Sequence, residues 1–220
     1  ALRVVARWFH TRGFAQEFAM AKLPKPKGRS RIIVVFSAAD VRAMLEDTKK
    51  RREGSRDQAL ILLLLDTGIR IGEAHSLTLH SINWGENFIT VCGKTGERSV
   101  PFGPRSKRAM RGYIDVERHA ANTGIKQVFL TNSGLPLDIS TLTKRVRLIA
   151  KAANVKSTKR GPHTFRHTFA VEFVRAGGDV FSLQQILGHT TLEMTRHYVH
   201  LAKSDLREAH RKFSPVSRML

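Results

Sequence analysis

Apolar residues recur along most of the chain at intervals of three or four, the spacing that places side chains on one face of an α-helix. The clearest such stripe follows Asp138, whose carboxylate is a suitable helix N-cap. Its members are Leu142, Val146, Ile149 and Ala153. Residues 56–65 are instead apolar nearly all round, which is typical of a helix buried at the centre of a domain. The same patterns predict further helices at about 2–10, 38–50, 72–77, 104–121, 162–176 and 182–187, and one around Tyr198.

One stretch near the middle of the chain has the character of strands. Residues 88–92 and 99–102 are strand-like, and Gly93-Lys94-Thr95-Gly96 between them predicts the tip of a hairpin. This turn is not a phosphate-binding P-loop, because the spacing G-x-x-x-x-G-K-[ST] is absent. The chain is therefore expected to be mainly α with a small antiparallel β-sheet, an α+β protein.

Prolines, glycines and charge divide the chain into four parts. They are a helix of a truncated N-terminal domain (residues 1–22), a linker (23–31), the main domain (32–203) and an amphipathic tail (204–220). Two prolines stiffen the linker, LPKPKGRSR, and its charge suits solvent or phosphate. Its basic residues expected on phosphate are Lys25, Lys27 and Arg29.

The charge balance points to a polyanionic partner. Lys and Arg number 38 against 18 Asp and Glu, which gives a net charge of +20 and a pI near 11.2. Such an excess favours nucleic acid over an anionic membrane. The single cysteine, Cys92, excludes an intrachain disulfide and fits a reducing cytoplasm. The longest apolar run, residues 59–65, is far too short to span a bilayer.

Basic residues gather in one part of the sequence. Between Ile139 and Val171 there are Lys and Arg residues but no acid, whereas ordinary solvated faces mix both signs. The predicted helix after Asp138 carries a basic stripe separate from its apolar one, and two further cations follow it. These residues are Lys144, Arg147, Lys151, Lys159 and Arg160. The pattern predicts that this surface lies on a DNA backbone.

A second cluster of polar residues is expected to bind a phosphodiester. His163 and Arg166 lie three residues apart on one helical face, and His167 is adjacent to them. His189 follows Gly188 at a helix end, and Tyr198 lies one short helix later. A guanidinium, imidazoles and a phenol together suit an oxyanion with open acceptors. The sequence thus predicts that Tyr198 attacks a DNA phosphate.

One more arginine belongs to this cluster. Arg70 comes directly after Asp66-Thr67-Gly68, where Gly68 can end the buried helix in the left-handed conformation. Glu73 is close enough in sequence to form a salt bridge with Arg70, and the same contact could hold the guanidinium in place for a substrate.

Four sequence blocks together resemble the catalytic domain of the tyrosine recombinases, the phage integrase family. They are DTGIRIGEA around Arg70, GKTGERSVPF with the hairpin Lys94, HTFRHTFA with His163 and Arg166, and LGHTTLEMTRHY with His189 and Tyr198. The resemblance covers about residues 2–213. It implies that residues 32–203 are the catalytic domain, preceded by a remnant of a helical core-binding domain. It also implies a clamp on duplex DNA, and a tail that docks on a neighbouring subunit in a homo-oligomer, dimer to tetramer, on DNA.

The resemblance also implies a mechanism. Tyr198 would form a 3′-phosphotyrosyl link, with Arg70, Arg166 and His189 on the phosphate oxygens. A phenol with a pKa near 10 needs a base, for which His163 is placed, and Lys94 would protonate the departing 5′-oxygen. Glu73 and His167 would support these groups. No metal, ATP or other cofactor is implied, and the enzyme is expected in the cytoplasm, associated with the nucleoid.

Three other interpretations compete with recombination. A zinc site at His163 and His167 is disfavoured, because H-T-F-R-H lacks the glutamate of H-E-x-x-H and the arginine would repel a dication. A type IB topoisomerase-like enzyme would use the same chemistry without exchanging partners. A non-catalytic DNA-binding regulator would keep the basic stripe without using Tyr198, and the intact catalytic set argues against it.

Overall fold

The computed structural model describes residues 2–14, 33–93, 96–157, 159–202, 210, 211, 214 and 216. The chain forms two units, residues 1–33 and 34–220. In the first unit, α1 (Leu2–Thr11) confirms the helix predicted near 2–10, and Gly13 follows it with φ +76°. The predicted linker cations, the hairpin Lys94 and most of the tail lie outside the described residues.

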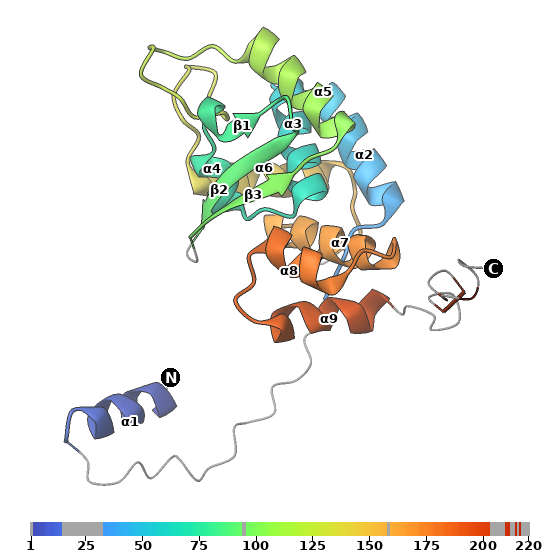
Figure 1. Ribbon diagram of the computed structural model, residues 1–220. Helices are drawn as coiled ribbons and strands as arrows, with labels where there is room; N and C mark the ends of the chain where they lie inside the picture. Colours follow the sequence, from blue (N-terminus) through green and yellow to red (C-terminus); the bar gives the residue numbers. More distant parts are fainter. Residues whose placement is uncertain are drawn as a thin grey trace. The chain divides into compact units, whose positions relative to one another are not determined.

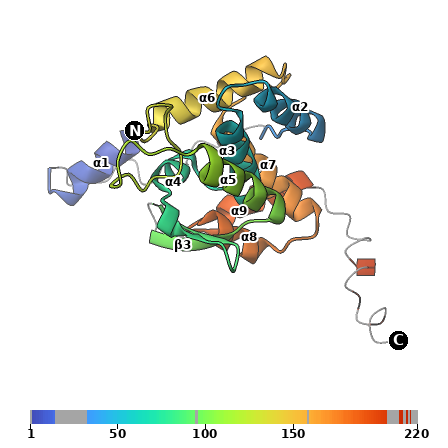
Figure 2. The ribbon, with the colours of Figure 1, turned by 90° about the horizontal axis from the view of Figure 1, so that it is seen from above.

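The second unit is built around a buried helix, α3 (Gly54–Thr67). It packs against α2 (Ala38–Lys49), α5 (Pro104–Gly112) and α7 (Pro162–Arg175), as the view from above shows (Figure 2). Its fully buried apolar side chains are Ala59, Leu60, Ile61, Leu63 and Leu64. The apolar side chains of α3 are therefore buried against neighbouring helices on several sides, as the sequence predicts.

Helix ends follow the local chemistry of the sequence. Ser37 caps α2, because its Oγ accepts a hydrogen bond from the Asp40 N–H while Asp40 accepts one from the Ser37 N–H. Gly68 ends α3 with φ +62°, and an added Cβ there would collide with Phe169. It leads directly into the short helix α4 (Ile71–Ser76), which puts Arg70 between two rigid elements.

A three-stranded antiparallel sheet lies beside these helices (Figure 1). A single 3₁₀ turn (Leu79–Ser81) leads into its strands, which are β1 (Ile82–Asn83), β2 (Phe88–Gly93) and β3 (Gly96–Pro101), in that order. Ile89 pairs with Val100, and Val91 pairs with Arg98. Ile89, Val91 and Val100 are buried. The predicted hairpin is therefore confirmed, with one face of the sheet towards the core.

The helix expected at 104–121 is shorter than predicted. α5 continues as one π-helical turn (Tyr113–Glu117) and ends at Arg118, which is extended. The Arg118 guanidinium donates to the carbonyls of Ile125 and Gln127, and so turns the chain into the following loop. Tyr113 is a buried packing residue, and its hydroxyl accepts a hydrogen bond of 3.0 Å from the Leu130 N–H.

Four helices complete the unit. α6 (Ile139–Ala152) starts at its Asp138 cap, and α7 leads to α8 (Val180–Leu187) and α9 (Leu192–Ala202), which pack on α7 and on each other (Figure 1). α8 begins two residues before the predicted start, because the Asp179 carboxylate accepts hydrogen bonds from the N–H groups of Phe181 and Ser182. None of the helices in the described parts of the chain is long and apolar enough to cross a membrane.

Candidate active site

Arg166 lies at the centre of the site, on the buried face of α7. Its side chain is buried, and its two terminal nitrogens donate to the carbonyls of Gly68 (2.8 Å) and Leu187 (2.7 Å). The guanidinium thus joins the C-terminal ends of α3 and α8. Burial, and then the charge of Arg70, lower the pKa of Arg166 to about 10, so it stays charged at neutral pH.

Arg70 is held by a buried carboxylate. Glu73 accepts a 2.7 Å hydrogen bond from the Arg70 N–H and forms a 3.0 Å ion pair with its Nη1. The predicted salt bridge between Glu73 and Arg70 is therefore present, and a role of Glu73 in holding Arg70 for a substrate stays a prediction. Burial alone would raise the pKa of Glu73, but its bonds to Arg98 and Arg70 outweigh burial and the pKa is lowered. The Arg70 side chain keeps 36% of its surface exposed, so it can reach a substrate.

Arg98 also forms an ion pair with Glu73, and the sequence patterns did not predict this contact. Its Nη1 and Nη2 donate to the two Glu73 oxygens at 2.8 and 2.9 Å. The alternation of the strand could have found it, because Arg98 lies two residues before the buried Val100 and so on the inward face of β3. An arginine on an inward face needs an acidic partner.

Tyr198 lies on α9 with 5% of its surface exposed. Its hydroxyl and His167 Nδ1 on α7 share a hydrogen bond of 2.9 Å. Burial raises the pKa of Tyr198, and the charges of Arg166 and Arg70 oppose that rise. Burial, followed by the charges of His163 and Arg166, lowers the pKa of His167. The phenol is thus protonated and held against a neutral imidazole at neutral pH.

His189 also lies beside the tyrosine ring. The two rings are nearly parallel, with centroids 6.2 Å apart. His189 Nδ1 shares a 2.9 Å hydrogen bond with the hydroxyl of Thr195, a fully buried residue that the sequence patterns also missed. Burial and the charges of Arg166, Arg70 and Arg98 lower the pKa of His189 to about 4, so it is neutral at pH 7. Arg70, Arg166, His189 and Tyr198 therefore share one site.

Comparisons with known proteins show which family the chain belongs to. A model of the phage integrase family matches residues 35–205. The chain belongs to the phage integrase family. Tyrosine recombinase XerD of Staphylococcus aureus is 31% identical over 217 residues, which cover 95% of this chain and 73% of that protein. The fold is therefore the tyrosine recombinase catalytic-domain fold, as the sequence blocks predict.

Solved structures give the same result. The crystal structure of XerA recombinase has a TM-score of 0.70 and 30% identity, over 89% of this chain and 68% of that one. XerH site-specific recombinase, bound to a palindromic difH substrate in a post-cleavage complex, has a TM-score of 0.71. Its identity is 22%, over 85% of this chain and 55% of that one, which shows a shared fold.

His163 borders the buried groups of this integrase-family site, because it shares a groove with His167. It is exposed and lines an open groove of about 940 Å³, the basic groove, which runs along α6, the loop after it and the start of α7. Its described lining includes five Lys or Arg residues and no acid, namely Arg147, Lys151, Lys156, Lys159 and Arg160. Four of the residues predicted to contact DNA therefore line the groove, together with Lys156, which was not among those predicted. Lys144 is exposed on α6 but is not among these lining residues.

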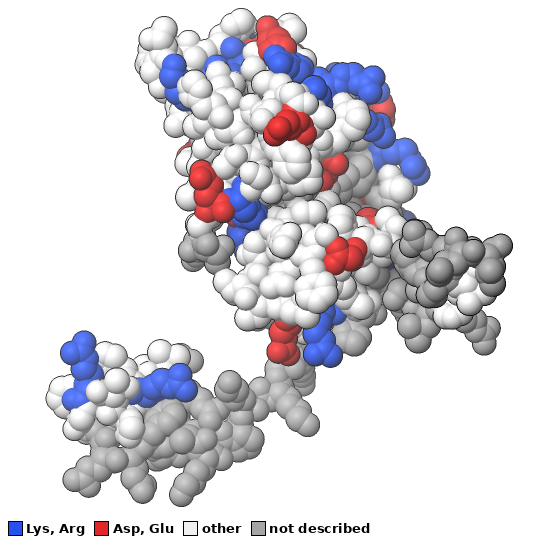
Figure 3. Space-filling view, viewed as in Figure 1, with Lys and Arg blue, Asp and Glu red and all other residues white. Residues whose placement is uncertain are grey.

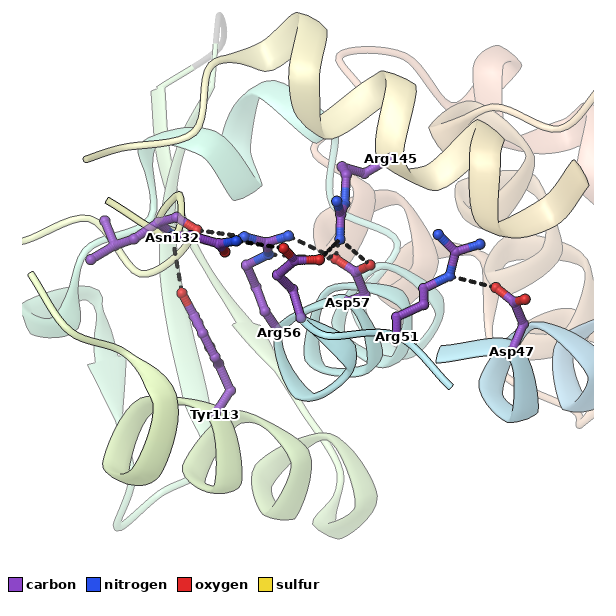
Figure 4. A network of polar contacts seen from close by, with 9 residues as sticks. Asp47, Arg51, Arg56, Asp57, Tyr113, Asn132 and Arg145 are labelled. Carbon is purple, nitrogen blue, oxygen red and sulfur yellow. Dashed lines mark hydrogen bonds and ion pairs between the residues drawn. The ribbon is translucent and has the colours of Figure 1, made fainter. Parts of the chain in front are cut away.

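Arg145, next to the basic stripe on α6, points towards Asp57 of α3 (Figure 4). It pairs with Glu53 at 2.8 Å and with the buried Asp57 at 2.7 Å. Asp57 also contacts Arg56, which donates to the Leu130 carbonyl. Acids from α3 and its start thus neutralise Arg145, although no acid is near it in the sequence. This network ties α6 to the central helix and leaves the basic stripe outside.

The basic groove differs in charge from the face of the molecule that Figure 3 shows, because its described lining has cations and no acid. On the face drawn in Figure 3, Lys and Arg are mixed with Asp and Glu.

The described residues contain no candidate metal site. No three of their His, Cys, Asp or Glu side chains are grouped so that they could hold an ion.

Proposed function

We propose that this chain is a site-specific DNA recombinase that cuts and rejoins duplex DNA through a phosphotyrosyl link at Tyr198. The convergence of Tyr198 with His167, His189 and two arginines supports this most directly. The relatives named recombinases favour this reading over a type IB topoisomerase or a regulator. The enzyme's partner is double-stranded DNA.

In the proposed reaction, the Tyr198 oxygen forms a bond to phosphorus while the bond from phosphorus to the 5′-oxygen breaks. Arg70 and Arg166 neutralise the charge that grows on the non-bridging oxygens. His189 donates a further hydrogen bond in the tautomer that we propose, in which Nδ1 accepts from the Thr195 hydroxyl and Nε2 carries the proton. The sequence of bond changes is reversible, so a 5′-hydroxyl from another strand can attack the phosphotyrosine and complete an exchange.

Two histidines on α7 accept the tyrosine proton in this proposal. His167 is the one in contact, at the 2.9 Å that proton transfer needs. His163, which the sequence predicts as the base, lines the basic groove where DNA would enter. We propose that His167 accepts the proton from Tyr198. His163 then passes the proton towards the groove.

Lys94 is the proposed acid that protonates the departing 5′-oxygen. It lies outside the described residues, but Gly93 before it does not. An added Cβ at Gly93 would lie 2.9 Å from a Glu73 oxygen, so the hairpin tip starts beside the Arg70 ion pair. This supports a place for Lys94 next to the phosphate.

Covalent capture tests the function. The chain is incubated with a pool of nicked duplexes of randomised sequence, in which the fragment after the cut diffuses away and traps the intermediate. We expect a protein–DNA adduct on a denaturing gel, with DNA attached to the peptide that contains Tyr198. Failure to form any adduct, or an adduct mapped to Tyr113, would overturn the proposal. The captured DNA would also give the preferred site.

DNA affinity should depend steeply on salt, because the proposed contacts in the basic groove are with phosphates. Neutralising Lys144, Arg147 and Lys151 together to Gln should weaken binding on all sequences and reduce the slope of log K against log salt by up to about three. Fluorescence anisotropy across a salt series measures this.

A matched control removes the same charge elsewhere. Arg105, Arg108 and Lys126 are exposed cations away from the basic groove, so changing all three to Gln should leave the slope nearly as in the parent. If the Lys144, Arg147 and Lys151 triple variant keeps the salt slope of the parent, the basic stripe on α6 does not touch DNA.

Four further points stay predictions. They are the domain boundaries, the linker contacts of Lys25, Lys27 and Arg29, the docking of the tail on a neighbouring subunit, and association with the nucleoid. We propose them as parts of the same function, because a recombinase that exchanges strands needs more than one active subunit on its DNA.

A further inference from the structure

We propose that Arg98 is a positioning residue that keeps the Arg70 guanidinium available for the DNA phosphate by occupying Glu73. This inference rests on the proposed function, since it concerns the same site. Arg98 is 13% exposed and is not expected to touch the DNA itself.

The contacts of Glu73 carry the first step. A carboxylate has about four acceptor positions on its two oxygens. Oε1 accepts from Nη1 of Arg70 and Nη1 of Arg98, and Oε2 accepts from the Arg70 N–H and Nη2 of Arg98. All four positions are therefore filled, and Arg98 fills two of them.

The second step is what this leaves to Arg70. Within the described residues its side chain makes one hydrogen bond, from Nη1 to Glu73. A guanidinium has five N–H donors, so most of those of Arg70 remain for an anion. Without Arg98, the buried carboxylate would have two open positions. It would attract the Arg70 guanidinium into a two-point contact and so withdraw donors from the phosphate.

The third step is that Arg98 itself is fixed. Its Nε donates to the Ile186 carbonyl at 2.8 Å, near the end of α8. Gly188 packs against the same side chain, and an added Cβ there would lie 3.1 Å from its Cδ, Nε and Nη1. Because Nε is anchored, the planar fork can only point at Glu73. One residue of β3 thereby connects the hairpin, the Arg70 ion pair and the helix end before His189.

Arg98→Gln tests the inference. In single-turnover cleavage at saturating DNA, we expect the variant to be about ten- to a hundredfold slower than the parent, the range seen for residues that orient metal ligands in other enzymes. The dissociation constant for DNA should stay near that of the parent. Arg98→Lys, which keeps the charge without the fork, should be slow as well. The control is Arg105→Gln, an exposed arginine of α5, which should cleave at the parent rate.

Two further measurements separate positioning from a merely structural role. On a substrate with a methylphosphonate at the cleavage site, one phosphate charge is gone and Arg70 matters less, so the defect of Arg98→Gln should nearly disappear. The ratio of the two rates within one variant does not depend on how much protein is folded. In a Glu73→Gln/Arg98→Gln double variant, the amide no longer attracts Arg70, and part of the cleavage rate should return.

The outcomes are distinct. An Arg98→Gln rate equal to that of the parent, or an equal defect on both substrates, would overturn the role of Arg98 while the parent still forms its adduct. A parent that forms no adduct at Tyr198 would instead overturn the proposed function.

Discussion

Tyr198→Phe should bind DNA like the parent and form no covalent adduct. The substitution removes the one oxygen that is proposed to attack phosphorus, and it keeps the ring that packs beside His167 and His189. Cleavage should therefore be lost completely. Denaturing gels with the nicked substrates measure the adduct, and anisotropy measures the binding.

Stability has to be checked in the same variant, because the hydroxyl has a structural contact. Loss of its hydrogen bond to His167 should lower the free energy of unfolding by about 1 kcal/mol, too little to unfold a typical domain. Tyr113→Phe is the matched control, since Tyr113 is the other tyrosine of the chain and its buried hydroxyl also has one partner. It should keep the adduct. An adduct that persists in Tyr198→Phe would exclude Tyr198 as the nucleophile.

Local sequence patterns predicted the elements that carry the site. The structure confirms the apolar stripe after Asp138, the buried helix at residues 56–65 and the glycines at 68 and 188 that end helices. Each of these features depends on residues a few positions apart. These features also bring Arg70 and His189 to helix ends. Contacts within one turn of a helix or one hairpin follow from spacing alone, which is why they could be predicted.

The side-chain partners of the site could not be predicted in the same way. Arg98 and Glu73 are 25 residues apart, and Arg145 and Asp57 are 88 apart, so their pairing depends on how the helices pack. His167 and Tyr198 are joined across two helices for the same reason. Charge counting along the sequence placed Arg145 in an acid-free region, whereas its acids come from another helix. Packing therefore decides which cations are paired with acids and which stay exposed.

Arg70 and Arg166, the two arginines proposed to act in catalysis, should behave differently when they are changed to alanine. Arg70→Ala removes donors from the transition state and leaves Glu73 paired with Arg98, so the fold should stay intact. We expect cleavage to slow by about a hundred- to a thousandfold, or roughly 3–4 kcal/mol of transition-state stabilisation. Single-turnover rates at saturating DNA measure it, and Arg105→Gln is again the control.

Arg166→Ala should slow cleavage at least as much and also lower the melting temperature. Its guanidinium holds the carbonyls of Gly68 and Leu187, and each buried acceptor that loses its donor costs about 1–3 kcal/mol. Arg166→Lys keeps a charge but cannot hold both carbonyls, so it should rank between the parent and the alanine variant in melting temperature. We therefore expect Arg70→Ala to cleave slowly and to keep the melting temperature of the parent. We expect Arg166→Ala to cleave slowly and to have a lower melting temperature. A near-parent cleavage rate in Arg70→Ala would show that Arg70 has no part in stabilising the transition state.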